Sequence, residues 1–292
     1  MPIADVVKKK HPGSPDSLPV DATGQHRRAV LAIAGSDSSG GAGIQADLRV
    51  IAAHGLHGLS AITAVTAQTS RAVRSVHLVP PRQLLAQIDA AFTDFDVAAV
   101  KVGMLGSAAA VDAVADYLRE AGARHIVLDP VLAASSGTAL LPSRGLARLR
   151  SRLIPLVELI TPNLPEAEAL LGRRLRSEDD MRGAGVDLLA LGAGAVLLKG
   201  GHRRGRDVCD YLFDGESTTV FSHARQPGSV RGTGCALASA IASGLALELS
   251  LRDAVARAEQ FLQREMQCAY RTGRRGAMQA MSPAKVNVAG GL

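Results

Sequence analysis

The fold class of this chain is decided by the segment AVLAIAGSDSSGGAGIQADLRVIAAH, residues 29–54. It begins with a short apolar run at residues 29–36, which is typical of a buried strand. A glycine-rich loop follows, and residues 44–54 then carry apolar side chains at the spacing of a helix. A strand, a loop and a helix in this order form the unit from which parallel sheets are built. The segment therefore predicts an α/β fold.

The same alternation continues outward from this segment. Further strands are expected at residues 59–68, 98–105, 125–131, 159–163 and 195–201, and further helices at 81–92, 107–121, 165–170, 179–191, 235–247 and 251–269. Such repetition indicates a three-layer αβα sandwich, in which helices cover both faces of a mostly parallel central sheet. Residues 209–226 interrupt the pattern, since two strand-like runs flank Asp214-Gly215, and they predict an antiparallel edge hairpin.

The composition is that of a folded protein, with 47% hydrophobic and 21% charged residues in a chain of 292. Residues 1–27 are polar, contain proline and lack periodicity, so we expect a flexible tail there and a single domain over residues 28–292. The longest apolar stretch, from Ala236, is broken by Ser, Gly and Glu, which argues against a membrane span. The N-terminal residues lack a secretory signal, and three widely spaced cysteines suit a reducing compartment. A cytoplasmic protein is expected.

The excess of basic residues raises the question of nucleic-acid binding. Lys and Arg together number 33 against 27 acidic residues, which gives a net charge of +6. Aromatic residues are only 3% and the basic residues are scattered, so we expect no nucleic-acid partner. Lysine is rare beside arginine, and Lys101 and Lys199 stand out because glycine closely follows each. A compact ammonium suits a phosphate, although chance also explains the pattern.

In parallel sheets, ligands bind beyond the carboxyl ends of the strands. The loop at residues 35–47 matches neither the dinucleotide fingerprint nor the P-loop. Its Ser36, Asp37 and Asp47, together with Gln68 after the next strand, could form hydrogen bonds with a flat polar ring. The plainer interpretation is a helix cap with a tight turn, and a surface carboxylate at Asp47.

The segment Gly232-Thr233-Gly234-Cys235 opens a helix of small residues. Its first-turn N–H groups and the helix dipole would suit a phosphoryl group, so an anion hole is expected. At this position the pKa of the Cys235 thiol should be lowered. A simple loop followed by a buried cysteine is the alternative.

A third motif, TPNLPE at residues 161–166, also follows a strand. Asn163 and Glu166 could hold a hydrated Mg²⁺ that bridges nucleotide phosphates, with Asp129 as a second acidic group and Lys199 offsetting phosphate charge. A glutamate in the first turn of a helix also stabilises the helix dipole, which is the simpler explanation.

Seven ordered segments resemble the hydroxymethylpyrimidine and phosphomethylpyrimidine kinases of thiamine biosynthesis, a family of the ribokinase-like superfamily. The segments are AIAGSDSSGGAGIQADL (32–48), AITAVTAQT (61–69), KVGML (101–105), VLDPV (127–131), LITPNLPEAEALL (159–171), AVLLKGGH (195–202) and GTGC (232–235). They span the chain from about residue 31 to residue 247, and the combination is far more specific than any one of them. The resemblance implies a ribokinase-like fold.

The resemblance also implies ATP-dependent phosphorylation of 4-amino-5-hydroxymethyl-2-methylpyrimidine and then of its monophosphate, with Mg²⁺ and in a homodimer. It implies that the pyrimidine is contacted by Gly35, Asp47, Gln68 and Met104. It implies a catalytic segment Gly232, Thr233, Gly234 and Cys235, with Cys235 beside the attacking oxygen. It also implies nucleotide contacts from Thr161, Asn163 and Lys199, and Mg²⁺ contacts from Glu166 and Asp129. The alternatives are a pyridoxal kinase of the same superfamily and a non-catalytic ligand-binding protein on this scaffold.

Three positions depart from the family pattern. Thr69 stands where members often have Asn, Ser135 where many have Lys, and Arg231 where many have His. The last two fall near phosphate-binding segments and therefore bear on the second phosphorylation. We expect Arg231 to pair with the phosphate already on the monophosphate substrate, and a solvated loop arginine is the alternative.

Overall fold

The computed structural model describes residues 28–69, 72–134, 136–201, 205–226, 230–272 and 277–279. The expected flexible tail, residues 1–27, and the departure at Ser135 lie outside these described residues. Every other predicted site residue lies within them.

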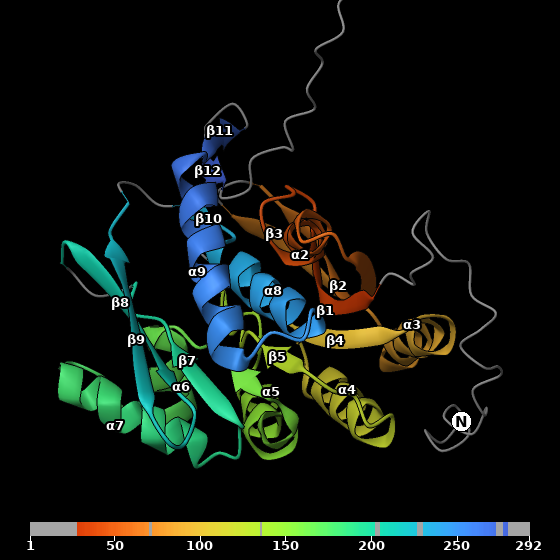
Figure 1. Ribbon diagram of the computed structural model, residues 1–292. Helices are drawn as coiled ribbons and strands as arrows, with labels where there is room; N and C mark the ends of the chain where they lie inside the picture. Colours follow the sequence, from red (N-terminus) through yellow and green to blue (C-terminus); the bar gives the residue numbers. More distant parts are fainter. Residues whose placement is uncertain are drawn as a thin grey trace, which may run out of the picture.

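A nine-stranded sheet of strand order β3-β2-β1-β4-β5-β6-β7-β8-β9 forms the centre of the molecule (Figure 1). Its strands are β1 (Ala29–Asp37), β2 (His57–Gln68), β3 (Val73–Leu78), β4 (Val97–Val102), β5 (Ile126–Leu128), β6 (Leu159–Ile160), β7 (Ala195–Leu198), β8 (Asp207–Phe213) and β9 (Thr218–Ala224). The strands from β2 to β7 in this order are all parallel. The mostly parallel sheet expected from the sequence is therefore confirmed.

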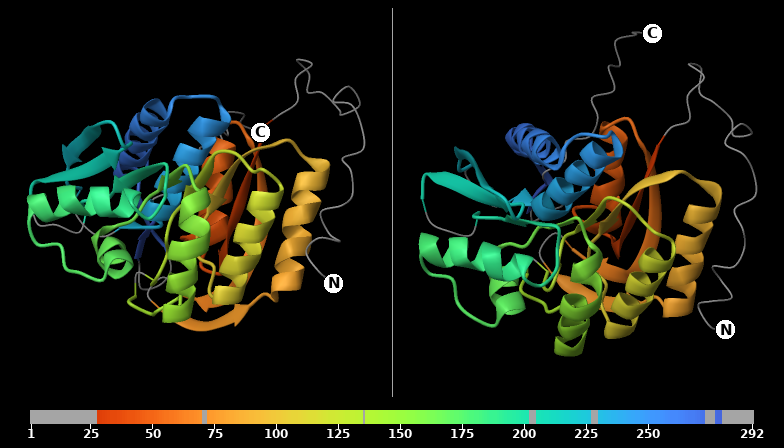
Figure 2. Two further views of the ribbon diagram at one scale, coloured as in Figure 1. Left: turned by 90° about the horizontal axis from the view of Figure 1, so that it is seen from below. Right: turned by 60° about the horizontal axis from the view of Figure 1, so that its bottom comes forward.

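Helices cover both faces of the sheet, as the turned views in Figure 2 show. One face carries α3 (Pro81–Asp94), α4 (Ala108–Glu120), α5 (Ser143–Arg148), α6 (Leu164–Leu171) and α7 (Glu178–Leu189), and the other carries α2 (Gly43–Ala53), α8 (Thr233–Ala246) and α9 (Leu251–Gln267). After α5 the chain continues through a π-helical turn (Leu149–Leu153) and a 3₁₀ turn (Ile154–Leu156). The three-layer arrangement expected from the sequence is confirmed.

The alternation of side chains along β1 explains how one strand serves two cores. Leu31 and Ile33 join the cluster beneath α3 and α4, whereas Val30 and Ala32 join the cluster beneath α2 and α8. All four side chains are completely buried. A strand with both faces covered must be apolar throughout, which is the pattern at residues 29–34.

The edges of the sheet differ from expectation. The antiparallel hairpin β8–β9 is present, but β3 also pairs antiparallel with β2 at the opposite edge. The sequence did not indicate β3, because its side chains are almost all exposed and it has no buried face to impose an apolar pattern. A small second sheet of β10 (Val230–Arg231), β12 (Ala277–Gln279) and β11 (Tyr270–Thr272) was also not expected.

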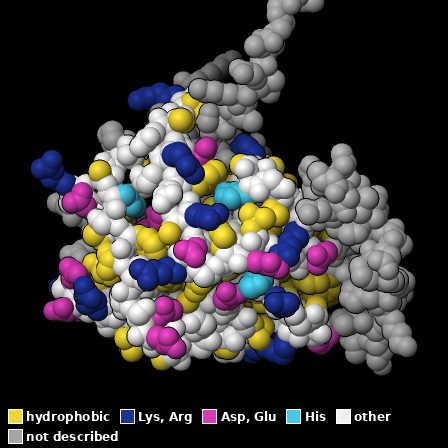
Figure 3. Space-filling view, in the orientation of Figure 1, with side chains coloured by type: hydrophobic (Ala, Val, Ile, Leu, Met, Phe, Trp, Pro, Cys, Tyr) yellow, Lys and Arg dark blue, Asp and Glu magenta, His cyan; other side chains and the backbone are white. Residues whose placement is uncertain are grey.

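Charged side chains of both signs are interspersed on the face drawn in Figure 3, which carries no broad surface of one sign. Among the described residues, no helix is both long and apolar enough to cross a membrane.

Two glycines of α7 provide a test of the packing between α7 and β8. A Cβ on Gly185 would fall 2.4 Å from ring atoms of the buried Phe213, whereas a Cβ on Gly183 would lie 3.7 Å from an Arg173 nitrogen at the exposed surface. Gly185→Ala should lower the free energy of unfolding by about 1–3 kcal/mol through overpacking. Gly183→Ala should raise it by about 0.5–1 kcal/mol, because alanine favours the helix. Urea unfolding measures the free energy of unfolding of both variants. Equal changes in the two would contradict the packing described.

Candidate active site

The predicted anion hole packs directly on the glycine-rich loop after β1. Gly232 has φ +77°, and a Cβ there would lie 2.1 Å from the carbonyl oxygen of Gly41, so only glycine fits at this contact. Thr233, Gly234 and Cys235 then form the first turn of α8, whose N–H groups have no partner within the helix. Two predicted motifs from opposite ends of the chain are thus in contact.

A buried ion pair lies behind this contact. Lys101 on β4 donates to both carboxylate oxygens of Asp47 on α2 at 2.9 Å, and both side chains are completely buried. Ser239, one turn after Cys235 on α8, donates to Asp47 Oδ1 at 2.9 Å. Burial opposes the charge on Lys101, but the Asp47 carboxylate, with Cys235 and Asp129, raises the pKa of the ammonium above its usual range. Strand β4 and helices α2 and α8 therefore meet at one charged centre.

This geometry changes the interpretation of Asp47. Its carboxylate was expected to contact the pyrimidine, yet it is 0% exposed and faces Lys101 and Ser239. The simpler sequence interpretation, a surface carboxylate, is wrong, because Lys101 compensates the cost of burying the charge. In this conformation Asp47 supports the site from behind.

The pKa of the Cys235 thiol is raised to about 12, so the lowered value expected from the sequence is wrong. Burial has the largest effect and disfavours the thiolate, and the carboxylates of Asp47 and Asp129 act in the same direction. The ammonium of Lys101 and a hydrogen bond from the N–H of Gly43 oppose this effect without overcoming it. The Cys235 thiol is therefore neutral near pH 7.

A second ion pair lies next to the anion hole. Lys199 Nζ donates to Asp129 Oδ1 at 3.0 Å, and a Cβ placed on Gly234 would be 3.2 Å from Lys199 Nζ and 3.6 Å from Asp129 Oδ2. The completely buried Thr161 also donates to Asp129 Oδ1, at 3.4 Å. Although burial opposes its charge, Lys199 and Lys101 lower the pKa of Asp129. The ends of β5, β6 and β7 thus bring these predicted residues to the start of α8.

Asn163 and Glu166 form a capping box at the start of α6. Asn163 Oδ1 accepts from the N–H of Glu166 at 3.0 Å, and Glu166 Oε2 accepts from the N–H of Asn163 at 2.8 Å. Burial raises the pKa of Glu166 to about 7, although Lys199 acts in the opposite direction. The described residues contain no cluster of three or more groups that could hold a metal. Any Mg²⁺ here would depend on one or two carboxylates together with water and phosphate oxygens.

The remaining residues predicted for the pyrimidine follow the ends of β1, β2 and β4. Gly35 and Met104 are in contact, because a Cβ on Gly35 would lie 2.9 Å from Met104 Sδ. Gln68 is half-buried, and its backbone N–H donates to Ser38 of the glycine-rich loop at 2.8 Å. The structure thus brings Gly35, Gln68 and Met104 to the same edge of the sheet as the anion hole.

Asp37 and Arg231 connect these segments. Asp37 accepts from the N–H groups of Ser39, Gly41 and Ala42, and so shapes the loop from within. Arg231 Nη2 lies 3.7 Å from Asp37 Oδ2, and Arg231 Nη1 donates to the carbonyl of Thr69 at 3.1 Å. Arg231 therefore ties the strand before the anion hole to the loop and to β2.

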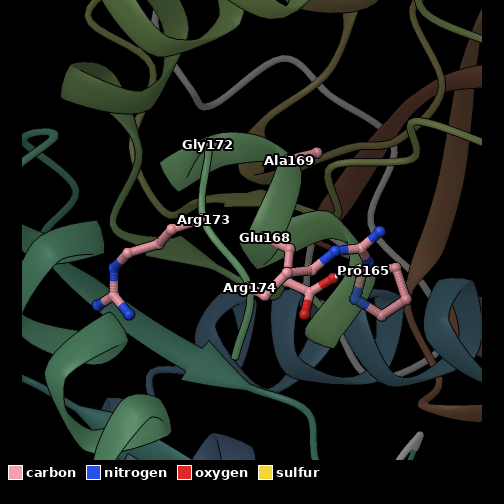
Figure 4. A pocket seen from close by; sticks show the side chains of 6 residues that line it. All are labelled: Pro165, Glu168, Ala169, Gly172, Arg173 and Arg174. Carbon is pink, nitrogen blue, oxygen red and sulfur yellow. Dashed lines mark hydrogen bonds and ion pairs between the residues drawn. The ribbon is translucent and has the colours of Figure 1, made fainter. Parts of the chain in front are cut away.

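Figure 4 shows an open pocket along α6, lined by Pro165, Glu168, Ala169, Gly172, Arg173 and Arg174. Its two arginines are already paired, Arg174 with Glu168 at 2.7 Å and Arg173 with Asp187 at 2.6 Å. None of the predicted site residues lines it, and the cluster around Gly232 and Lys199 remains the candidate active site.

The Lys101–Asp47 pair allows a direct test of its structural role. Lys101→Met should lower the free energy of unfolding by about 3–5 kcal/mol, because it leaves a buried carboxylate without its partner. Lys101→Gln combined with Asp47→Asn removes both charges, keeps an amide hydrogen bond and should recover most of that loss. Arg173→Met, which breaks an exposed pair, should cost about 0–1 kcal/mol. Additive losses in the double variant, measured by urea unfolding, would refute the coupling.

Comparison with known proteins adds independent evidence to this geometry. Residues 37–279 match the family model described as phosphomethylpyrimidine kinase. The chain is 46% identical over 249 residues to the thiamine biosynthesis bifunctional protein ThiED of Geobacter sulfurreducens, which covers 85% of this chain and about half (51%) of that protein. It is 45% identical to the hydroxymethylpyrimidine/phosphomethylpyrimidine kinase of Escherichia coli, with 80% of this chain and 88% of that protein covered.

Solved structures also resemble this fold. Phosphomethylpyrimidine kinase from Clostridium difficile superposes with a TM-score of 0.74 at 39% identity, over 82% of this chain and 99% of that one. An ADP complex of Bacillus subtilis pyridoxal kinase superposes with a TM-score of 0.79 at 30% identity, over 87% and 98% of the chains. These neighbours share the ribokinase-like fold expected from the sequence. From its sequence match, its sheet and the contact between its glycine-rich loop and anion hole, the chain belongs to the phosphomethylpyrimidine kinase family.

Proposed function

We propose that this protein is the hydroxymethylpyrimidine and phosphomethylpyrimidine kinase of thiamine biosynthesis, and that it uses ATP to phosphorylate 4-amino-5-hydroxymethyl-2-methylpyrimidine and then its monophosphate. The observation that supports this most strongly is the contact between the Gly232–Cys235 turn and the loop after β1. This contact supports the proposal, because a helix terminus that could bind a phosphoryl group lies beside a loop that could form hydrogen bonds with a flat ring.

The pyrimidine would lie between Gly35, Gln68 and Met104. The amide of Gln68 can both donate and accept, so it can pair with a ring nitrogen and the exocyclic amine of an aminopyrimidine. Gly35 and Met104 are in contact, and their apolar atoms could pack against the ring. Asp47 would support the site from behind through Lys101 and Ser239.

The phosphate end would lie at Gly232–Cys235 and Lys199. The N–H groups of Thr233, Gly234 and Cys235 would bind the transferring phosphoryl group, and Lys199 would neutralise charge on the nucleotide phosphates. Lys199 is close to this turn and is fixed by Asp129. Thr161 and Asn163 complete the nucleotide side, since the backbone of Asn163 pairs with that of Lys199.

The acidic groups present fit Mg²⁺. Asp129 and Glu166 both interact with the charge of Lys199, since each raises the pKa of that ammonium. Each carries a carboxylate, the hard oxygen ligand that Mg²⁺ prefers. One oxygen of Glu166 is used by the capping box, which leaves the other for a water molecule of the metal. When bound with the nucleotide, the metal would supply charge neutralisation at the phosphates.

Cys235 would receive the hydroxymethyl proton late in the transfer, in those molecules whose thiol has first given up its own proton to water. A thiol with a raised pKa is ionised in few molecules near pH 7 but is a strong base once ionised. Positioning and charge neutralisation would therefore supply most of the rate, with proton transfer following bond formation.

Arg231 would take part in the second phosphorylation. Its guanidinium lies at the joint of the glycine-rich loop and β2, at 3.1 Å from the Thr69 carbonyl, where a cation could pair with the phosphate of the monophosphate. We further propose one domain over residues 28–292 and a homodimer. The free thiols of Cys209, Cys235 and Cys268 suit a cytoplasmic location.

A coupled assay of ADP release tests the proposed function. With MgATP, we expect turnover of hydroxymethylpyrimidine and then of its monophosphate, with a lower kcat/KM for pyridoxal and little ADP release without either ring. Turnover of pyridoxal alone would favour the pyridoxal kinase alternative. Binding of the rings without turnover would favour a non-catalytic protein.

Replacing Cys235 tests the proposed proton acceptor. Cys235→Ala should lower kcat about 10²- to 10⁴-fold, the range for loss of general base catalysis, while the KM for the pyrimidine stays within about twofold. Cys268→Ala, a change of the same kind at an exposed cysteine, is the control and should have normal kcat. Normal turnover in Cys235→Ala would show that another group or water accepts the proton.

A further inference from the structure

A buried carboxyl pair lies behind the turn that carries Lys199. Glu259 on α9 is 6% exposed and Asp210 on β8 is 5% exposed. The two carboxyl groups interact with each other, and neither Glu259 oxygen has a hydrogen-bond donor among the described residues. Two buried carboxylates that interact without a donor between them repel, so a proton on Glu259 stabilises the pair.

Within the described part of the chain, the charged groups around Glu259 do not offer it an alternative partner. His223 on β9 has its Nδ1 3.9 Å from Glu259 Oε2, and burial lowers the pKa of the imidazole, so this ring is neutral near pH 7. Lys199 is bound to Asp129 at 3.0 Å. Helix α8, which packs along α9, contains no Asp, Glu, Lys, Arg or His. Gln263, one turn further along α9, has an Nε2 that reaches no acceptor among the described residues.

Asp210 connects this pair to the active site. Its Oδ1 accepts from the N–H of Gly200 at 2.6 Å, directly after Lys199. A Cβ on Gly200 would lie 2.1 Å from the carbonyl oxygen of Cys209, so the turn is pressed against β8. On its other side, the N–H of Lys199 donates to the carbonyl of Pro162 at 2.9 Å. The backbone of Lys199 is therefore held between the start of α6 and Asp210.

We propose that Glu259 and Asp210 share one proton, and that this pair is a positioning element that holds the Lys199–Gly200 turn in place for the nucleotide. The inference rests on the proposed function and deepens it, since the position of Lys199 then depends on a proton bound between α9 and β8. With the proton present, Glu259 donates to Asp210, and Asp210 keeps its bond to Gly200. Without it, two buried negative charges face each other and the turn loosens.

The sign of the pH dependence follows from the direction of the shift. Burial and the charge of Asp210 raise the pKa of Glu259 to about 9, well above its value in the unfolded chain. Between the unfolded pKa and about 9, the folded protein binds the extra proton, so this pair makes the free energy of unfolding fall as pH rises through that window. Above this pH window the Lys199–Gly200 turn should no longer be held in place.

Two amide substitutions distinguish this role from a purely structural one. In Glu259→Gln the new amide donates permanently to Asp210, and in Asp210→Asn the new amide donates to Glu259 while its oxygen still accepts from Gly200. Both should keep activity near pH 7 and abolish the dependence on the proton. Glu259→Lys, which supplies a permanent cation to Asp210, should do the same. Glu216→Gln, at an exposed carboxyl in the β8–β9 turn, is the matched control.

The experiment measures kcat/KM for MgATP from pH 6 to 10 with saturating hydroxymethylpyrimidine. For wild type and Glu216→Gln we expect a loss of about tenfold for each pH unit above the midpoint, carried mainly by the KM for ATP. The three variants at positions 259 and 210 should lose at least about fivefold less at pH 10. Equal losses in all proteins, or variants that are folded by circular dichroism but inactive at every pH, would overturn the proposal.

Thermal unfolding over the same pH range tests the pair without any turnover. The Tm of wild type should fall as pH rises, and the Tm of Glu259→Gln should fall less. An identical pH dependence in both would refute the shared proton. Failure of wild type to phosphorylate hydroxymethylpyrimidine at pH 7 would instead refute the proposed function.

Discussion

The active site depends on the buried ion pair between Lys101 and Asp47. Neither side chain has any exposed surface, so neither charge is tolerable without the other, and the pair can form only when β4, α2 and α8 have come together. Ser239 adds α8 to this centre through Asp47. The helix whose first turn is the proposed anion hole is thereby fixed to the strand and loop that are proposed to face the pyrimidine. The Asp47 carboxylate keeps Lys101 charged, and burial together with the same carboxylate keeps the Cys235 thiol protonated.

A second feature of the site is that several residues have both a structural and a chemical use. Asn163 and Glu166 cap α6, and Glu166 is also a proposed Mg²⁺ contact. Asp129 fixes Lys199, and Asp37 shapes the loop while it faces Arg231. A site built in this way has little freedom to rearrange. Catalysis by positioning, which phosphoryl transfer requires, is what such a site supports.

Local patterns predicted most of the fold and the residues of the candidate site, but they did not predict the electrostatics of that site. The alternation of buried strands and amphipathic helices gave β1, β2, α2 and the edge hairpin, because each is defined by neighbouring residues. Strand β3 was not predicted because it has no buried face. The partner of Asp47 is 54 residues away, and the raised pKa of Cys235 comes from burial, so neither could be derived from local spacing. Lys101 stood out by its rarity, yet its role became visible only in three dimensions.

We propose that the turn at Gly232–Cys235 binds the phosphoryl group during its transfer, with the pyrimidine on the side of the glycine-rich loop. The most direct measurement is a crystal structure with ADP, Mg²⁺, hydroxymethylpyrimidine and aluminium fluoride, which mimics that group. We expect the fluoride complex within hydrogen-bonding distance of the N–H groups of Thr233, Gly234 and Cys235, and the hydroxymethyl oxygen between it and the Cys235 thiol. A fluoride complex bound away from this turn, or a pyrimidine that does not contact Gln68, would contradict the claim.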